Sequence, residues 1–96
     1  MKIEYHPFTV DDISNAEAYY EEQRPGLSHA FRVEVLQAIE HITENPLLYA
    51  EVNGVRRAFL RHFPFSIVYR ILKNDTIRIL FIRHHKRHST FGGGRH

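Results

Sequence analysis

Apolar residues recur at helical spacing in the first half of the chain. Ile13, Ala16 and Tyr20 stand at i, i+3 and i+7, so they share one face of a helix. A carboxylate of Asp11 or Asp12 can accept hydrogen bonds from the first backbone N–H groups of that helix. The pattern therefore predicts an amphipathic helix that begins at one of these two acids.

A second helix is expected after Pro25-Gly26, with Ser28 as its cap. Its apolar stripe consists of Phe31, Val35, Ala38 and Ile42, widened by Leu36 and Ile39. Asn45-Pro46 ends it, because the residue before a proline disfavours helical backbone angles. Only a few residues separate the two helices, so we expect an antiparallel helical hairpin.

The second half of the chain changes to a period of two. Residues 55–63, 65–72 and 76–83 are short segments rich in β-branched and aromatic side chains, as is typical of strands. Lys73-Asn74-Asp75 is a tight-turn sequence that joins the last two segments as a β-hairpin. Lys2 to Tyr5 also alternates, which predicts a short N-terminal strand.

Alternation assigns each strand two faces. One face is predicted to carry Ile67, Tyr69 and Ile71 with Ile77, Ile79 and Phe81. The opposite face carries Ser66, Val68 and Arg70 with Arg78, Leu80 and Ile82, and on the preceding strand Arg57, Phe59 and Arg61 share a face. The predicted fold class is α+β: an N-terminal strand and an α-helical hairpin packed on a small antiparallel β-sheet, whose other face is partly cationic.

Length and composition limit the classes of protein. Ninety-six residues make one domain, here residues 1–91, followed by a flexible glycine-rich tail, residues 92–96. The absence of cysteine excludes disulfides and cysteine-ligated metals. The longest aliphatic and aromatic run, Ile79 to Ile82, is too short to span a bilayer, and the N-terminus has no secretory pattern. We expect a cytoplasmic protein without membrane contact.

Charge divides the chain in two. Residues 1–55 hold ten of the eleven acids and three bases, hence about −7, whereas residues 56–96 hold ten bases and one acid, hence about +9. The whole chain is only +2. The basic half includes Arg83-His84-His85-Lys86-Arg87-His88, and such a cluster commonly meets phosphate or acidic protein.

The basic residues suggest two kinds of site. Arg57, Arg61 and Arg70 lie on consecutive predicted strands and could gather with the 83–88 run to bind phosphate oxygens. Together with imidazoles that move protons near neutral pH, they could support metal-free RNA cleavage; alternatively, they form a solvated face. The candidate catalytic residues are Arg57, Arg61, Arg83, His85, Arg87 and His88. The candidate target- or phosphate-contacting residues are Arg83, His84, His85, Lys86, Arg87, His88 and Phe91.

A zinc site formed by His84, His85 and His88 is disfavoured. No carboxylate is near in sequence, and the cations between these histidines would repel a dication. We therefore expect no metal and no cofactor. Phe91 could stack on an RNA base or could equally cap the sheet.

Several segments, taken in order and spacing, resemble the RelE/ParE superfamily, the toxins of bacterial type II toxin–antitoxin pairs. The segments are residues 18–27, 31–42, 45–46, 55–57, 63–70 and 77–87, so the resemblance covers nearly the whole chain. It implies an α-helical hairpin against a small antiparallel sheet. It also implies a cognate antitoxin as partner, in a hetero-oligomer, through a disordered acidic or amphipathic segment that covers apolar grooves and masks the basic patch.

The superfamily holds two activities, and the resemblance permits a comparison of their residues. RelE-like members cut mRNA on the ribosome, and ParE-like members poison DNA gyrase. Ser66, Phe59 and Phe91 stand where a RelE-like nuclease would carry an arginine, a lysine and a tyrosine, whereas Arg57 and Arg87 match nuclease positions.

These differences favour a ParE-like gyrase inhibitor that is not an enzyme. The alternative is a RelE-like ribosome-dependent, metal-free mRNA endoribonuclease, in which the histidines of the 83–88 run replace the missing acid–base groups. A third possibility is an antitoxin-binding module without toxicity.

Overall fold

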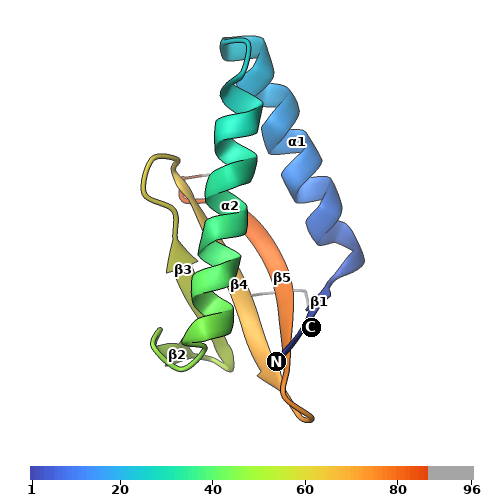
Figure 1. The fold of residues 1–96 in the computed structure, drawn as a ribbon, viewed down its shortest axis with the longest axis vertical. Coiled ribbons are helices and arrows are strands. Elements are labelled where there is room, and N and C mark those ends of the chain that lie inside the picture. The colour runs from blue at the N-terminus through green and yellow to red at the C-terminus, as the bar shows by residue number, and fades with distance from the viewer. Residues whose placement is uncertain (87–96) are drawn as a thin grey trace.

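The computed structural model describes residues 1–86 and shows an α-helical hairpin lying across one face of a five-stranded sheet (Figure 1). The elements are β1 (Lys2–Tyr5), α1 (Pro7–Gln23), α2 (Leu27–Glu44), β2 (Glu51–Val52), β3 (Val55–Phe59), β4 (Phe65–Leu72) and β5 (Thr76–His84). This arrangement confirms the α+β fold class. The predicted end of the domain at residue 91 and the tail at 92–96 lie outside the described residues.

The sheet is mixed rather than purely antiparallel. Its strand order is β1-β5-β4-β3-β2, and neighbouring strands from β2 to β5 are antiparallel. β1 lies parallel to β5, with Lys2 opposite Thr76 and Tyr5 opposite Ile79. Parallel pairing needs a long crossover, and the helical hairpin supplies part of it between these two strands.

Two tight turns set the antiparallel register. The predicted hairpin between β4 and β5 is confirmed, and Asn74 and Asp75 take φ values of 64° and 53° in its turn. Asn and Asp tolerate this left-handed region better than other side chains. Asn53-Gly54 makes a second hairpin between β2 and β3, which the strand pattern did not predict because β2 has only two residues.

α1 begins earlier than predicted, at Pro7. His6 is the N-cap, and its Nδ1 accepts a hydrogen bond from Phe8 N–H at 3.1 Å. Pro7 suits the first helical position, since its missing N–H would have no partner there. The prediction that Asp11 or Asp12 caps α1 was therefore wrong, and Asp12 bonds to β5 instead.

α2 is capped by backbone geometry and by an acid from α1. Its N-cap is Gly26, with φ +90°, a left-handed conformation that any side chain would strain. The predicted cap, Ser28, lies inside the first turn, where its hydroxyl donates to Glu21 Oε1 at 2.6 Å. The Glu21 carboxylate also accepts from the N–H groups of Gly26 and Ser28, so it fixes the turn between the helices.

The helix-facing core lies between α2 and the central strands. α2 buries Phe31, Val35, Ile39 and Ile42, which confirms most of its predicted stripe, whereas Leu36 is 57% exposed. An aromatic cluster at one end of this core joins both helices to the sheet. Its rings are Tyr20, Phe31, Phe63 and Phe65, with centroid separations of 4.8–6.1 Å.

β5 contains a β-bulge. Val68 of β4 lies opposite Phe81, but the next residue, Tyr69, lies opposite Ile79. Leu80 is thus one extra residue in β5. A bulge of this kind interrupts the alternation of side chains between the two faces of a sheet.

The bulge reverses the faces predicted for the end of β5. Ile82 joins the helix-facing core, whereas Phe81 and Leu80 belong to a second apolar cluster with Val55 and Val68. The prediction that Phe81 shares the face of Ile77 and Ile79 was wrong for this reason. We call the sheet face that carries the second cluster the outer face, because it lies opposite the helical hairpin.

Two polar side chains of α1 bond to the backbone around the bulge. Thr9 is fully buried, and its hydroxyl donates to the carbonyl oxygen of Leu80 at 2.7 Å. One turn later, Asp12 Oδ2 accepts from Ile82 N–H at 3.1 Å. Residues i and i+3 lie on one face of a helix, so α1 presents both groups to the bulge together.

We predict that Thr9→Val destabilises the fold by about 1–3 kcal/mol, because it removes a buried donor from the Leu80 carbonyl. Urea unfolding followed by circular dichroism measures the change. Thr43→Val is the matched control: the Thr43 hydroxyl donates to Ile39 O within the same helix, so its loss should cost less than about 1 kcal/mol. Equal losses in the two variants would contradict a special role for the bulge contact.

Candidate functional site

The outer face brings three strands into register around the predicted site residues. Phe59 on β3 lies opposite Ser66 on β4, which lies opposite Arg83 on β5. The adjacent row consists of Arg57, Val68 and Phe81. Arg57 and Arg83 thus stand in adjacent rows of one face, but β4 lies between their strands.

Phe59 is the exposed centre of this surface. Its side chain is 56% exposed, and the Arg57 guanidinium carbon lies 4.6 Å from its ring centroid. The His85 ring packs against it edge-on, with centroids 5.0 Å apart. A ring flanked by a guanidinium and an imidazole can stack on a planar group and hold an anion beside it.

Arg83 and Ser66 are buried in the same row. Arg83 is 6% exposed, and its guanidinium carbon lies 4.2 Å from the centroid of the Phe81 ring, a cation–π contact. Ser66 is fully buried, and its hydroxyl oxygen has no hydrogen-bond partner among residues 1–86. The bulge makes the contact between Arg83 and the Phe81 ring possible, because it places Phe81 on the outer face.

The histidines at the end of β5 contact different layers. The His84 ring lies 5.1 Å from that of Phe65, which belongs to the helix-facing core, and its Nδ1 accepts from Lys86 N–H at 3.1 Å. His85 contacts Phe59 on the outer face. The 83–86 part of the basic run is therefore not one continuous surface. Arg87, His88 and Phe91 lie outside the described residues.

Arg61 is separated from the strand arginines. The first predicted strand was too long: β3 ends at Phe59, and Leu60 N–H then donates to Phe65 O at 2.9 Å as the chain turns. Pro64 within this connection has no N–H to give to a ladder. Arg61 is exposed and lines a groove between α2 and β3. Arg70 lies opposite Arg78, which forms an ion pair with Glu4.

Tyr69 serves the fold and not the outer face. It is fully buried on the helix side, and its hydroxyl donates to Pro46 O at 2.7 Å. Burial raises the pKa of Tyr69 to about 12, so the hydroxyl stays protonated at neutral pH. This bond attaches the segment after α2 to the middle of the sheet.

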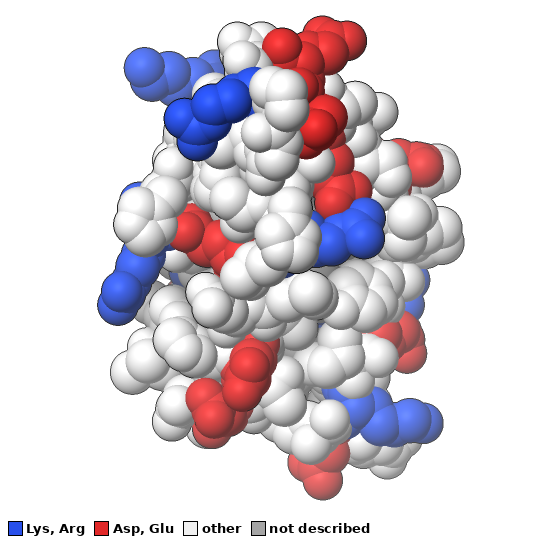
Figure 2. All heavy atoms as spheres, turned by 45° about the horizontal axis from the view of Figure 1, so that its top comes forward, with Lys and Arg blue, Asp and Glu red and all other residues white. Residues whose placement is uncertain are grey.

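Ion pairs join the acidic and basic halves of the chain. Glu4 pairs with Arg78, and Glu51 lies 3.7 Å from Arg56. Figure 2 shows acidic and basic side chains interspersed on the face it presents, which includes the helices. Part of the opposite net charge of the two halves of the sequence is thus neutralised by ion pairs within the fold.

The exposed groups of the outer face are cationic and aromatic. Arg57, Arg83 and His85 can attract an anion, and the exposed ring of Phe59 can stack. Phe59 and Ser66 carry no group that ionises near neutral pH. Within residues 1–86, no three histidine, aspartate or glutamate side chains cluster to hold a metal ion.

The sequence matches, over residues 3–88, the family described as "ParE toxin of type II toxin-antitoxin system, parDE". The chain belongs to the ParE toxin family. A solved structure titled "Chromosomal ParDE TA system from P. aeruginosa" shares its fold, with a TM-score of 0.76 and 21% sequence identity over 88% of this chain and 95% of that chain. No protein of curated function matches this ParE-family toxin. None of the helices in residues 1–86 is both long and apolar enough to cross a membrane.

Glu34 of α2 fixes the connection between β3 and β4. Its Oε2 accepts from His62 N–H at 2.8 Å, and its Oε1 lies 2.6 Å from His62 Nδ1. Burial raises the pKa of Glu34, but the hydrogen bonds and charge of His62 outweigh burial, so the pKa lies below its ordinary value. The connection matters to the outer face because Pro64 O accepts from His85 N–H at 2.9 Å.

The pKa of Glu34 is lower in the folded protein than in the unfolded chain, where a glutamate has a pKa of about 4.3. Ionised Glu34 therefore stabilises the fold at pH values above the unfolded pKa. This contribution is lost as pH falls through the lower folded pKa. We predict that the free energy of unfolding of Glu34→Gln falls less between about pH 5 and pH 3 than that of the wild type, as measured by urea unfolding at each pH. Glu22→Gln, at an exposed site on α1, should retain the wild-type slope. Identical slopes for wild type and Glu34→Gln would refute the assignment.

Proposed function

We propose that this type II toxin inhibits DNA gyrase and is neutralised by a cognate antitoxin. The observation that carries the choice of target is the row Phe59–Ser66–Arg83 at the centre of the outer face. Two of its three positions are those at which a RelE-like nuclease would present a lysine and an arginine. Here one is a phenyl ring and the other a buried hydroxyl.

The missing groups matter energetically. Removing one donor that stabilises transition-state charge costs about 10²–10³ in rate. Binding a target does not require those groups. An exposed ring with flanking cations supplies contact area and electrostatic attraction without proton transfer. The outer face therefore fits a surface that holds a target better than one that cleaves it. Both gyrase and the antitoxin would be met in the cytoplasm.

The second candidate remains a RelE-like ribosome-dependent mRNA endoribonuclease. One arrangement favours it: Arg57 and His85 flank Phe59, so a guanidinium and an imidazole approach one exposed point. In that mechanism His85 would move the proton and Arg57 would hold the phosphate. The third candidate, a non-toxic antitoxin-binding module, predicts normal growth when the chain is expressed without antitoxin.

We predict that the purified toxin inhibits gyrase supercoiling and leaves mRNA on programmed ribosomes uncut. Phe59→Ala should weaken gyrase inhibition at least tenfold, about 1.4 kcal/mol, if Phe59 is a central contact. Phe8→Ala on α1 is the matched control, because Phe8 is 57% exposed and Phe59 is 56% exposed. Cleavage of mRNA that is lost in His85→Ala, without any effect on gyrase, would support the nuclease instead.

We also predict a complex with the product of the adjacent gene, with a dissociation constant well below 1 μM (about −8 kcal/mol or tighter). Isothermal titration measures it directly. Toxin that is bound to this protein should no longer inhibit gyrase in the supercoiling assay. The absence of any binding at micromolar concentration would argue strongly against an antitoxin encoded there.

A further inference from the structure

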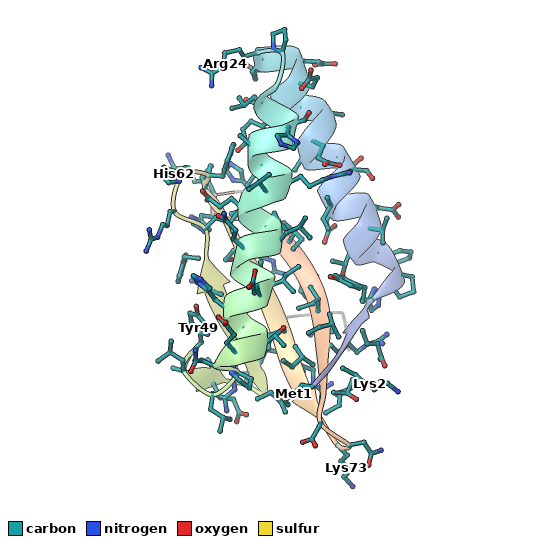
Figure 3. All side chains as sticks on the ribbon, in the orientation of Figure 1. Met1, Lys2, Arg24, Tyr49, His62 and Lys73 are labelled. Carbon is teal, nitrogen blue, oxygen red and sulfur yellow. The ribbon has the colours of Figure 1, made fainter. Side chains whose placement is uncertain are left out.

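β1 is an open edge of the sheet. It stands at the end of the strand order, and no other segment of residues 1–86 pairs with its outer side. In Figure 3, Lys2 lies at this edge and Lys73 lies at the turn between β4 and β5. A strand at an open edge presents backbone groups onto which a strand of another chain can pair.

The hydrogen bonds on the inner side of β1 show which of its backbone groups face outward. Lys2 N–H donates to Asp75 O at 2.9 Å, and His6 N–H donates to a carbonyl oxygen of β5. Backbone groups of successive residues point in alternate directions along a strand, so those of Ile3 and Tyr5 point away from β5. The N–H and C=O groups of these two residues therefore face the open side.

The side chains of β1 are divided by type between the two faces of the sheet. Ile3 packs against the helix-facing core, and alternation places Met1 and Tyr5, which are 48% and 41% exposed, on the same face. Lys2 and Glu4 stand on the other face, where Glu4 forms an ion pair with an arginine of β5. The Glu4 side chain is still 47% exposed in that pair, so its carboxylate can accept a second cation.

The order of side chains from Met1 to Tyr5 is self-complementary in the antiparallel direction. A two-fold axis at Ile3 would place Lys2 of each copy opposite Glu4 of the other, and Met1 opposite Tyr5. Opposite charges would then meet on one face of the sheet, and apolar side chains would meet on the other. Ile3 would exchange backbone hydrogen bonds with Ile3 of the second copy, because its N–H and C=O groups face outward.

Other registers of the same two strands are disfavoured. A shift of one residue would set Ile3 opposite Glu4 and mix apolar with charged side chains on both faces. An axis at Lys2 or Glu4 would use backbone groups that face β5 and would set like charges opposite each other. An axis at Tyr5 would set Ile3 opposite Pro7, which has no N–H and begins α1. The axis at Ile3 satisfies both the side chains and the backbone.

We propose that two copies of this toxin associate through their β1 strands, antiparallel about Ile3. The two sheets form one continuous sheet, with both helical hairpins on the same side of it. The partner is a second copy of the chain, because the charges of β1 complement their own reversed order. The contact is short, so the dimer is reversible, with a dissociation constant on the order of 10–100 μM. This association depends neither on the gyrase target nor on the antitoxin.

Exchange of the two charges tests the register. Lys2→Glu alone and Glu4→Lys alone each set like charges opposite one another, so each should weaken self-association about tenfold or more in sedimentation equilibrium. An equimolar mixture of the two variants restores both pairs of opposite charges. The mixture should therefore dimerise about tenfold more tightly than either variant alone.

Lys73→Glu is the matched control for Lys2→Glu. It makes the same change of charge at the exposed turn between β4 and β5 and should alter self-association less than about threefold. Glu4→Lys also removes the ion pair with Arg78, but this loss is the same in the mixture. Unfolding curves establish that each variant is folded. No recovery in the mixture, or equal weakening by Lys73→Glu, would contradict the proposal.

Amide hydrogen exchange on the complete toxin locates the interface. The amides of Ile3 and Tyr5 should exchange about threefold or more slowly at about 500 μM than at about 5 μM, because pairing supplies them with acceptors. A dimer in which both amides exchange at the same rate at the two concentrations uses another surface and overturns the proposal. A toxin that stays monomeric up to about 500 μM also overturns it. Gyrase inhibition is measured separately, so the proposed function would stand in either case.

Discussion

The arrangement of the whole molecule depends on how α1 meets the bulge in β5. Thr9 and Asp12 bond to the backbone at Leu80 and Ile82, where the extra residue disturbs the ladder. Buried backbone groups cost free energy when they lack partners, so a bulge beneath a helix is stable only if that helix supplies polar groups. The same contact fixes α1 across the sheet, and α2 follows because the Glu21 carboxylate fixes the short turn between the helices.

The bulge also determines what the outer face presents. By sending Ile82 toward the helices, it completes the core at the aromatic end of the molecule. By sending Phe81 the other way, it provides the ring on which Arg83 packs. A single inserted residue thus links the stability of the fold to the composition of its outer face. Natural proteins often use bulges beside functional sites for this reason.

The two surfaces of this ParE-family toxin divide its charge differently from its sequence. The outer face carries arginines and an exposed ring, and the groove beside β3 carries the acids of α2 together with Arg61. Other acids and bases pair internally, and exposed pairs contribute only about 0–1 kcal/mol each. The net charge of each surface is therefore set by the fold as well as by the order of residues in the chain.

The sequence alone determined the fold class, the helical hairpin, four of the five strands and the turn at Lys73 to Asp75. Periodicity and turn residues act locally, so they can be read without knowing the fold. The sequence also pointed to Arg57 and His85 as candidate site residues. It could not show that His85 packs against Phe59 beside Arg57, because residues 59 and 85 are far apart in the chain.

Only the tertiary structure decided the bulge in β5 and the parallel placement of β1. No glycine marks the bulge at Leu80, and its carbonyl finds a donor only when α1 crosses β5. Asp12, which the sequence predicted as a cap of α1, instead accepts a hydrogen bond from Ile82 N–H on β5. The contacts of Thr9 and Asp12 with β5 join residues about seventy positions apart, and no local pattern in the sequence records them.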